Sequence, residues 1–244
     1  MSGHSHAKTI KHDKEIADQK RGNIFSKFAR QISLAVRDKG SNPETNSSLR
    51  FAIERAKSFN MPKENIERAI KKGTGELAGE NLEEILFEAY GPGGIAIIVE
   101  GITDNKNRAL GEIKNIINDY NGKLVGEGSV KWMFERRGLI TITLNNETQN
   151  PKTKEELEMK TIEAGADDIY WQDDLLEIYT KPEDLEKVKK NLEAQNIKIE
   201  SALLGWLAKE EIAVDAKDKE RAEKLFNALD DNEAVQEIYS NLKN

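Results

Sequence analysis

The fold of this chain is decided at residues 62–79, which read PKENIERAIKKGTGELAG. The first part predicts a helix that opens at Pro62, because the first N–H groups of a helix have no intrahelical partner and proline lacks that donor anyway. Its apolar stripe repeats at helical spacing and consists of Ile66, Ala69 and Ile70. Gly73 is expected to stop this helix in the left-handed conformation. The glycines from there to Gly79 indicate a linker.

Two more helices are expected before this stretch. Apolar residues recur at helical spacing over residues 25–36 and 49–59, and the first of these helices is expected to end near Gly40. One of the polar residues 46–48 can cap the second helix. Three amphipathic helices with short connections predict a small bundle. Residues 1–22 hold few apolar side chains and are expected to form a mobile arm ahead of the bundle.

Strands are expected after the glycine-rich linker. Runs typical of β-strands at residues 85–90 and 95–102 flank residues 91–94 (GPGG). This composition predicts a hairpin turn rather than a phosphate-binding loop, because such a loop runs from a strand into a helix. A helix capped by Thr103 or Asp104 is expected to follow the second strand.

The rest of the chain alternates short strands and helices. The further expected strands are 130–135, 139–144, 168–171, 175–179, 197–204, 206–214 and 235–239. The further expected helices are 154–164, one from Pro182, and 217–229. The middle run has the order β-α-β-β-α-β, which fits a split βαβ unit of ferredoxin-like type. We therefore predict an α+β protein in which a three-helix domain (1–75) precedes two small ferredoxin-like α+β domains. One of these (136–206) is inserted in the other (80–135 plus 207–244).

The charge of the chain is divided between its two ends. Residues 1–75 hold 16 Lys and Arg against 8 Asp and Glu, whereas residues 76–244 hold 21 against 36. The net charge of −7 therefore combines a basic helical module with an acidic remainder. Because nucleic acid is the commonest large polyanion in a cell, this asymmetry predicts that the basic module binds nucleic acid.

The candidate nucleic-acid-binding residues are the basic side chains of this module and two histidines of the arm, which can donate hydrogen bonds to phosphate. They are His4, Lys8, Lys11, His12, Lys14, Lys20, Arg21, Lys27, Arg30, Arg50, Lys57, Lys63, Arg68, Lys71 and Lys72. Arg68 and Lys72 are four residues apart and share one helical face. The alternative is that these cations are solvated or are paired locally with Glu54, Glu64 and Glu67.

A second candidate anion site lies at residues 103–108, where a strand leads into a helix. The unpaired N–H groups at the start of a helix favour an anion. The residues of this candidate site are Asn105, Lys106 and Arg108. The alternative is an ordinary helix cap with solvated neighbours.

Composition argues against several classes of site. The chain has no cysteine, which excludes disulfides, thiolate metal sites and thiol nucleophiles. His4 and His6 alone make a weak metal site. The acidic pairs at 167–168 and 173–174 have no His or Ser close to them in the sequence, so no set of catalytic groups is visible. We expect no metal, no cofactor and no enzymatic activity.

Apolar segments are short throughout. No run approaches the roughly 18 residues of a membrane-spanning helix, and residues 1–13 lack the apolar core of a secretory signal. We therefore expect a cytoplasmic protein without a membrane partner. Trp132, Trp171 and Trp206 fall in segments typical of strands and are expected to be core residues rather than platforms on which bases stack.

Several segments together resemble the YebC/PmpR family, and the resemblance spans nearly the whole chain. The segments are 1–5 (MSGHS), 10–12 (IKH), 20–22 (KRG), 60–75 (NMPKENIERAIKKGTG), 88–94 (EAYGPGG), 103–108 (TDNKNR) and 128–134 (GSVKWMF). Three positions depart from the family pattern. Ala7 stands where the family has Trp, His6 where it has Lys, and Asp13 where it has a basic residue.

The resemblance implies a regulator that is not an enzyme. Members are described as transcriptional regulators that bind DNA, and relatives such as the mitochondrial translational activator of cytochrome oxidase act on the ribosome and relieve stalling at proline-rich stretches. The family's form, a helical domain followed by two α+β domains with one inserted in the other, agrees with the element order. We expect a translation factor that contacts ribosomal RNA, and tRNA as a further partner, through residues 1–75. The alternative is a DNA-binding transcriptional regulator.

Overall fold

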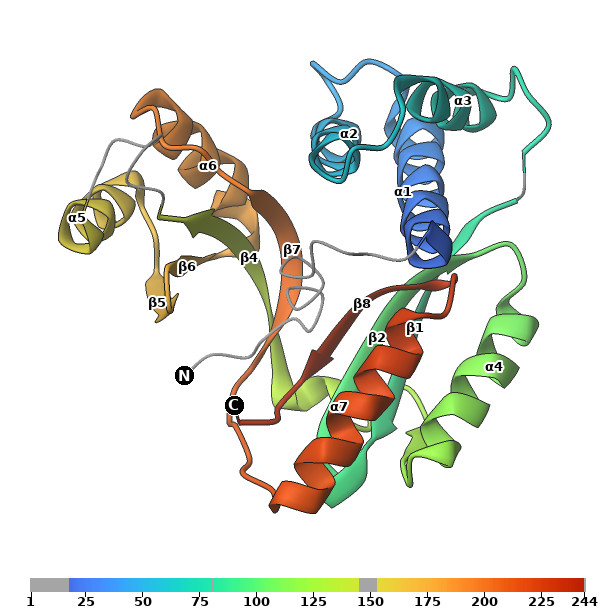
Figure 1. The fold of residues 1–244 in the computed structure, drawn as a ribbon. Coiled ribbons are helices and arrows are strands. Elements are labelled where there is room, and N and C mark those ends of the chain that lie inside the picture. The colour runs from blue at the N-terminus through green and yellow to red at the C-terminus, as the bar shows by residue number, and fades with distance from the viewer. Residues whose placement is uncertain (1–17, 80, 145–152, 244) are drawn as a thin grey trace. The chain divides into compact units, whose positions relative to one another are not determined.

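The computed structural model of the protein describes residues 18–79, 81–144 and 153–243 (Figure 1). Within these ranges, no helix combines the length and the apolarity needed to cross a bilayer. The chain divides into two compact units, and each is described by itself. One unit consists of residues 135–207, and the other contains the described residues before and after it.

The second of these units begins with three helices: α1 (Asp18–Lys39), α2 (Ser47–Ser58) and α3 (Lys63–Thr74). Their shared core is built from the predicted apolar stripes and includes Phe28, Ile32 and Leu49. Asn46 caps α2, because its side chain accepts a hydrogen bond from the N–H of Leu49 at 3.0 Å. The three-helix prediction is confirmed.

The end of α3 differs from the prediction. Gly73 lies inside the helix, and the left-handed residue that ends it is Gly75, with φ of 80°. A Cβ atom at Gly73 would lie 2.6 Å from the backbone oxygen of Ser33 in α1. Gly73 is therefore required for the close approach of two helices and not for a turn.

Four strands in the order β3-β1-β2-β8 form the first sheet. They are β1 (Glu83–Tyr90), β2 (Ala96–Thr103), β3 (Lys123–Val125) and β8 (Val235–Ser240). The helices α4 (Lys106–Asp119) and α7 (Ala216–Asp230) share one apolar core with this sheet. The strands β1 and β2 form the predicted antiparallel hairpin around residues 91–94.

The opposite face of β2 and β8 contacts α1 and α2. Leu34 of α1 is buried with Leu82 and with Ile102 of β2. The three helices and the first sheet lie in one compact unit.

The unit 135–207 contains the second sheet, in the order β5-β6-β4-β7. Its strands are β4 (Phe134–Thr143), β5 (Asp168–Gln172), β6 (Leu175–Thr180) and β7 (Ser201–Ala208), and its helices are α5 (Lys154–Ala164) and α6 (Leu185–Ala194). Along the chain these elements follow the order β-α-β-β-α-β, which is that of a split βαβ unit. The first sheet differs from it in having a hairpin, β1–β2, at its centre. The protein is an α+β fold.

Two strand predictions are wrong. Residues 130–135 and 139–144 do not form two strands, because Lys131–Met133 is a 3-10 helix and a single strand, β4, begins at Phe134. Residues 206–214 are not one strand either, since β7 ends at Ala208. The short strand β3 was not anticipated by the apolar pattern.

Candidate nucleic-acid interface

Five exposed cations on α2 and α3 form what we call the outer basic face: Lys57, Lys63, Arg68, Lys71 and Lys72. Lys63 lies 3.5 Å from the carboxylate of Glu67, one turn along the same helix. Within the described ranges, the side chains of the other four have no hydrogen-bond or ion-pair partner. They are therefore available to an external polyanion.

The packing of α3 on α1 determines which side of α3 is exposed. Ile66 and Ala69 are buried in the bundle, and the hydroxyl of Ser33 donates to the backbone oxygen of Ala69 at 2.8 Å. Gly73 allows the backbones to approach there. With this side buried, Arg68 and Lys72 lie on the exposed side.

Two other predicted nucleic-acid-binding residues form ion pairs within the protein instead. Lys27 is only 8 % exposed, and its ammonium lies 3.0 Å from the carboxylate of Asp230 at the end of α7. Arg30 donates to the carboxylate of Glu233 at 3.0 Å and to the backbone oxygen of the same residue at 2.6 Å. These cations join α1 to the corner between α7 and β8, so they do not belong to the outer basic face.

A third ion pair extends this internal contact. The guanidinium of Arg55 in α2 lies 2.6 Å from the carboxylate of Glu237 in β8, and it also lies over the ring of Phe28 at 5.8 Å. The negative charge of Glu237 raises the pKa of Arg55 although burial opposes the rise. We call Lys27, Arg30 and Arg55 the inner cations. Three cations of the basic module thus neutralise carboxylates of the acidic part of the chain.

Arg21 and Arg50 take intermediate positions. Arg21 is exposed near the start of α1, whereas Arg50 is half-buried, lies over the ring of Phe51 at 5.7 Å and donates to the backbone oxygen of Pro43 at 3.4 Å. The remaining predicted contacts, His4, Lys8, Lys11, His12 and Lys14, lie outside the described residues, as do His6, Ala7 and Asp13. Lys20 lies in α1, but its side chain is outside the described part.

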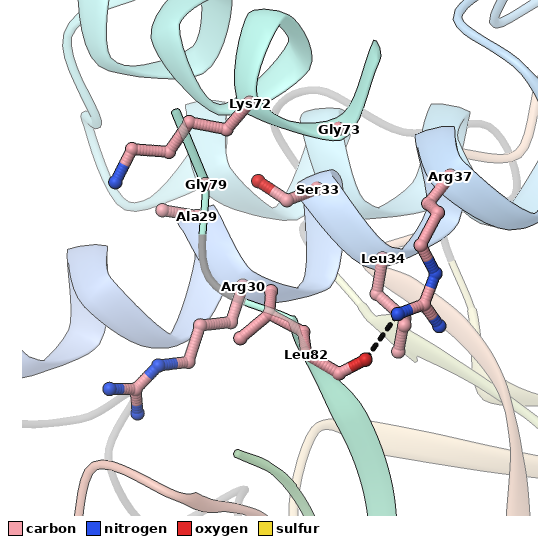
Figure 2. A pocket seen from close by; sticks show the side chains of 9 residues that line it. All are labelled: Ala29, Arg30, Ser33, Leu34, Arg37, Lys72, Gly73, Gly79 and Leu82. Atoms are coloured by element: carbon pink, nitrogen blue, oxygen red, sulfur yellow. Dashed lines mark hydrogen bonds between the residues drawn. The ribbon is translucent and has the colours of Figure 1, made fainter. Parts of the chain in front are cut away.

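A small pocket is lined by residues of α1, of the end of α3 and of the segment that follows it. It has a volume of about 80 Å³, and Leu34, Leu82 and Lys72 are among the residues that line it. Figure 2 shows Arg37 donating to the backbone oxygen of Leu82. The side chains of Arg30 and Lys72 extend away from Arg37, to the left of the view. Small-molecule sites usually occupy about 300 Å³ or more, so this pocket is too small for a nucleotide.

The second candidate anion site is a capped helix start. Asn105, rather than Thr103 or Asp104, caps α4 by accepting from the N–H of Arg108 at 3.0 Å. The guanidinium of Arg108 pairs with Asp104, and Lys106 is exposed. An anion here would have to displace both interactions, so the geometry favours the cap.

The acidic pairs at 167–168 and 173–174 belong to no metal-binding cluster in the described ranges. No group of three His, Asp or Glu side chains there is arranged to hold a metal ion. Asp167 is engaged with Arg137 at 2.9 Å in the second sheet.

Sequence reasoning missed one exposed aromatic residue. Trp132, expected in the core, is 64 % exposed. It lies on the 3-10 helix that replaces the predicted strand. The glycines at 126 and 128 and Ser129 just before it were the available signal of a turn.

Two family models cover almost the whole chain. The TACO1/YebC protein N-terminal domain matches residues 5–76, and the TACO1/YebC second and third domain matches residues 82–242. A protein named "Probable transcriptional regulatory protein" from Thermoanaerobacter pseudethanolicus is 47 % identical over 100 % of this chain and 97 % of its own length. A protein of the same name from Thermotoga maritima is 46 % identical over 100 % of this chain and 94 % of its own.

A solved structure agrees with these matches. The crystal structure of a conserved hypothetical protein from Aquifex aeolicus is 43 % identical, with a TM-score of 0.87 over 96 % of this chain and 95 % of that chain. The chain belongs to the TACO1/YebC family.

Proposed function

We propose that this protein is a nucleic-acid-binding regulator of gene expression without enzymatic activity, and that the outer basic face contacts the phosphate backbone. The observation that carries the proposal is the division of the cations. The inner cations are neutralised by carboxylates of the same chain, whereas Lys57 of α2 and Arg68, Lys71 and Lys72 of α3 are exposed. The relatives named as transcriptional regulators support a regulatory role.

Within this proposal, the partner we favour is the ribosome in the cytoplasm. The protein would contact ribosomal RNA, with tRNA as a further partner, and relieve stalling at proline-rich stretches. Cations on a helical surface suit contact with RNA, which proteins recognise largely through phosphate and shape. The acidic remainder of the chain would then stay off the phosphates.

The second candidate is a DNA-binding transcriptional regulator, and the printed names of the relatives favour it. In that case α3 would be the recognition helix in the major groove. Glu64 and Glu67 are exposed on α3 beside its cations, so they would meet phosphates unfavourably. This charge pattern is the reason for placing DNA second.

Ribosome co-sedimentation across a salt series tests the proposal. Arg68→Glu with Lys72→Glu should weaken binding at low salt and reduce the slope of log affinity against log salt by about 1.5, because two phosphate contacts are lost. The matched control is Lys187→Glu with Lys190→Glu, two exposed lysines on α6. Equal binding by both folded variants would refute the outer basic face as the site. Tighter, promoter-specific binding to DNA would instead select the second candidate.

A further inference from the structure

Among the described residues of its compact unit, Trp132 is the most exposed large apolar side chain. It is 64 % exposed, and Leu77, at 42 %, is the other large apolar side chain classed as exposed among the described residues of that unit. Tryptophan is usually well buried, because its large apolar surface is costly to leave in water. An isolated exposed tryptophan therefore needs an explanation.

Hydrogen bonds to a buried carboxylate fix the backbone of the segment that precedes Trp132. The buried carboxylate of Glu88 in β1 accepts three backbone N–H bonds, from Gly128 at 2.7 Å, Val130 at 2.7 Å and Lys131 at 2.9 Å. Burial would raise the pKa of Glu88, but these hydrogen bonds and the Lys131 ammonium together lower it. The carboxylate thus fixes the backbone just before Trp132.

The indole and its own backbone are held as well. The ring N–H donates to the backbone oxygen of Ser129 at 3.0 Å, and the ammonium of Lys209 donates to the backbone oxygen of Trp132 at 2.8 Å. The N–H of Lys209 also donates to the backbone oxygen of Met133 at 2.9 Å. The one polar group of the ring is satisfied internally, so what the side chain offers to a partner is apolar surface in a fixed orientation.

The surroundings of Trp132 indicate the kind of partner. Within the described ranges, no aromatic ring or cation stacks on the indole. The adjacent segments carry both signs of charge, with Lys131 and Lys209 against the exposed carboxylates of Glu127 and Glu210. The buried core of a protein interface is depleted of charged residues, whereas charged side chains flank Trp132 on both segments; a single rigid ring in such surroundings suits the flat face of a base.

We propose that Trp132 is a stacking platform for an unpaired nucleobase. The inference rests on the proposed function and adds a second contact in the same compact unit as the outer basic face. Because the local charges nearly cancel, stacking rather than phosphate contact provides the affinity at Trp132. Its contribution is therefore independent of salt, whereas that of the outer basic face falls as salt rises.

Binding of a single-stranded oligoribonucleotide tests this. Trp132→Ala should weaken binding on the order of tenfold by the same factor at low and high salt, with the salt slope unchanged. Trp132→Phe should restore part of the loss. The control is Met159→Ala, which truncates a side chain of the same 64 % exposure on α5 and should change nothing.

A second readout uses fluorescence. In a Trp171→Phe, Trp206→Phe variant, Trp132 is the one remaining tryptophan, and an unpaired oligonucleotide should quench its emission, whereas an abasic strand of equal length should not. Two results would overturn the stacking platform and leave the proposed function standing. One is equal quenching by both strands. The other is unchanged affinity in Trp132→Ala, provided that Arg68→Glu with Lys72→Glu still weakens binding. Failure of the wild-type protein to bind any nucleic acid would overturn both.

Discussion

Arg55 of α2 and Glu237 of β8, separated by 182 positions in the sequence, form an ion pair of 2.6 Å that joins the helical bundle to the first sheet. Glu237 is 7 % exposed, so the ion pair with Arg55 compensates a buried negative charge. Together with the other inner cations, Arg55 explains why the basic helices and the acidic sheet form one unit.

The first prediction concerns this pair. Arg55→Ala should lower the free energy of unfolding by about 3 kcal/mol, because it removes the ion-pair partner that lies 2.6 Å from a buried carboxylate. Urea denaturation followed by circular dichroism measures the change. Lys63→Ala, which breaks the exposed Lys63–Glu67 pair on α3, should cost less than about 1 kcal/mol. Similar small losses in both variants would contradict a structural role for Arg55.

A second experiment should show that the inner cations affect stability and not nucleic-acid binding. Lys27→Met removes a buried cation from Asp230 and should destabilise the protein by about 1–3 kcal/mol. Because this ammonium faces Asp230 and not solvent, nucleic-acid affinity and its salt slope should match those of the wild-type protein at a temperature where both are folded. A reduced salt slope would show that Lys27 leaves Asp230 to contact phosphate.

A third prediction uses two glycines in helices. Gly73→Ala places a Cβ atom 2.6 Å from the oxygen of Ser33 and should destabilise by about 1–3 kcal/mol. Gly111→Ala in α4, where nothing lies within 4 Å of the new atom, should stabilise by about 0.5–1 kcal/mol. Thermal melts measure whether each variant is less or more stable than the wild-type protein. A stabilised Gly73→Ala would refute the close contact of α1 with α3.

The fourth prediction is a dependence on pH. Because the pKa of Glu88 is lowered in the folded state, its ionised form contributes stability above the ordinary value of 4.5, and this contribution is lost as the pH falls through the lowered value. Glu88→Gln should therefore cost about 1–3 kcal/mol at neutral pH, and the gap to wild type should narrow in acid. Glu84→Gln, an exposed residue of the same strand, should show a small and constant difference. A gap that widened in acid would contradict the direction of the shift.

Local patterns predicted most of the secondary structure, and distant contacts account for the errors. The helices followed from apolar spacing, and Asn46 was among the expected caps. Either Gly73 or Gly75 could end α3 by local preference, and the packing of Gly73 on α1 decides between them. Trp132 lies in a segment whose composition is typical of a strand, but Glu88, 44 positions earlier, holds the backbone just before Trp132 as a turn.

The sequence predicted the net positive charge of the basic module but not which of its cations are exposed. Counting charges identifies the module, because a surplus of cations needs no structure to be seen. Which cations face outward depends on carboxylates that are about two hundred positions away in the sequence, at Asp230, Glu233 and Glu237. No helical periodicity in α1 or α2 distinguishes Lys27 and Arg55 from Lys57, so the division into inner cations and outer basic face required the fold.

The hydrogen bond between Lys209 and Met133 has a consequence for the inserted unit 135–207. The chain leaves for that unit just after Met133 and returns just before Lys209, and these two residues are joined at 2.9 Å. Excision of the intervening segment therefore opens a gap that a few glycines can bridge without stretching either end. The α1–α3 bundle and the first sheet lie in the other compact unit, so we expect the shortened chain to fold without residues 135–207.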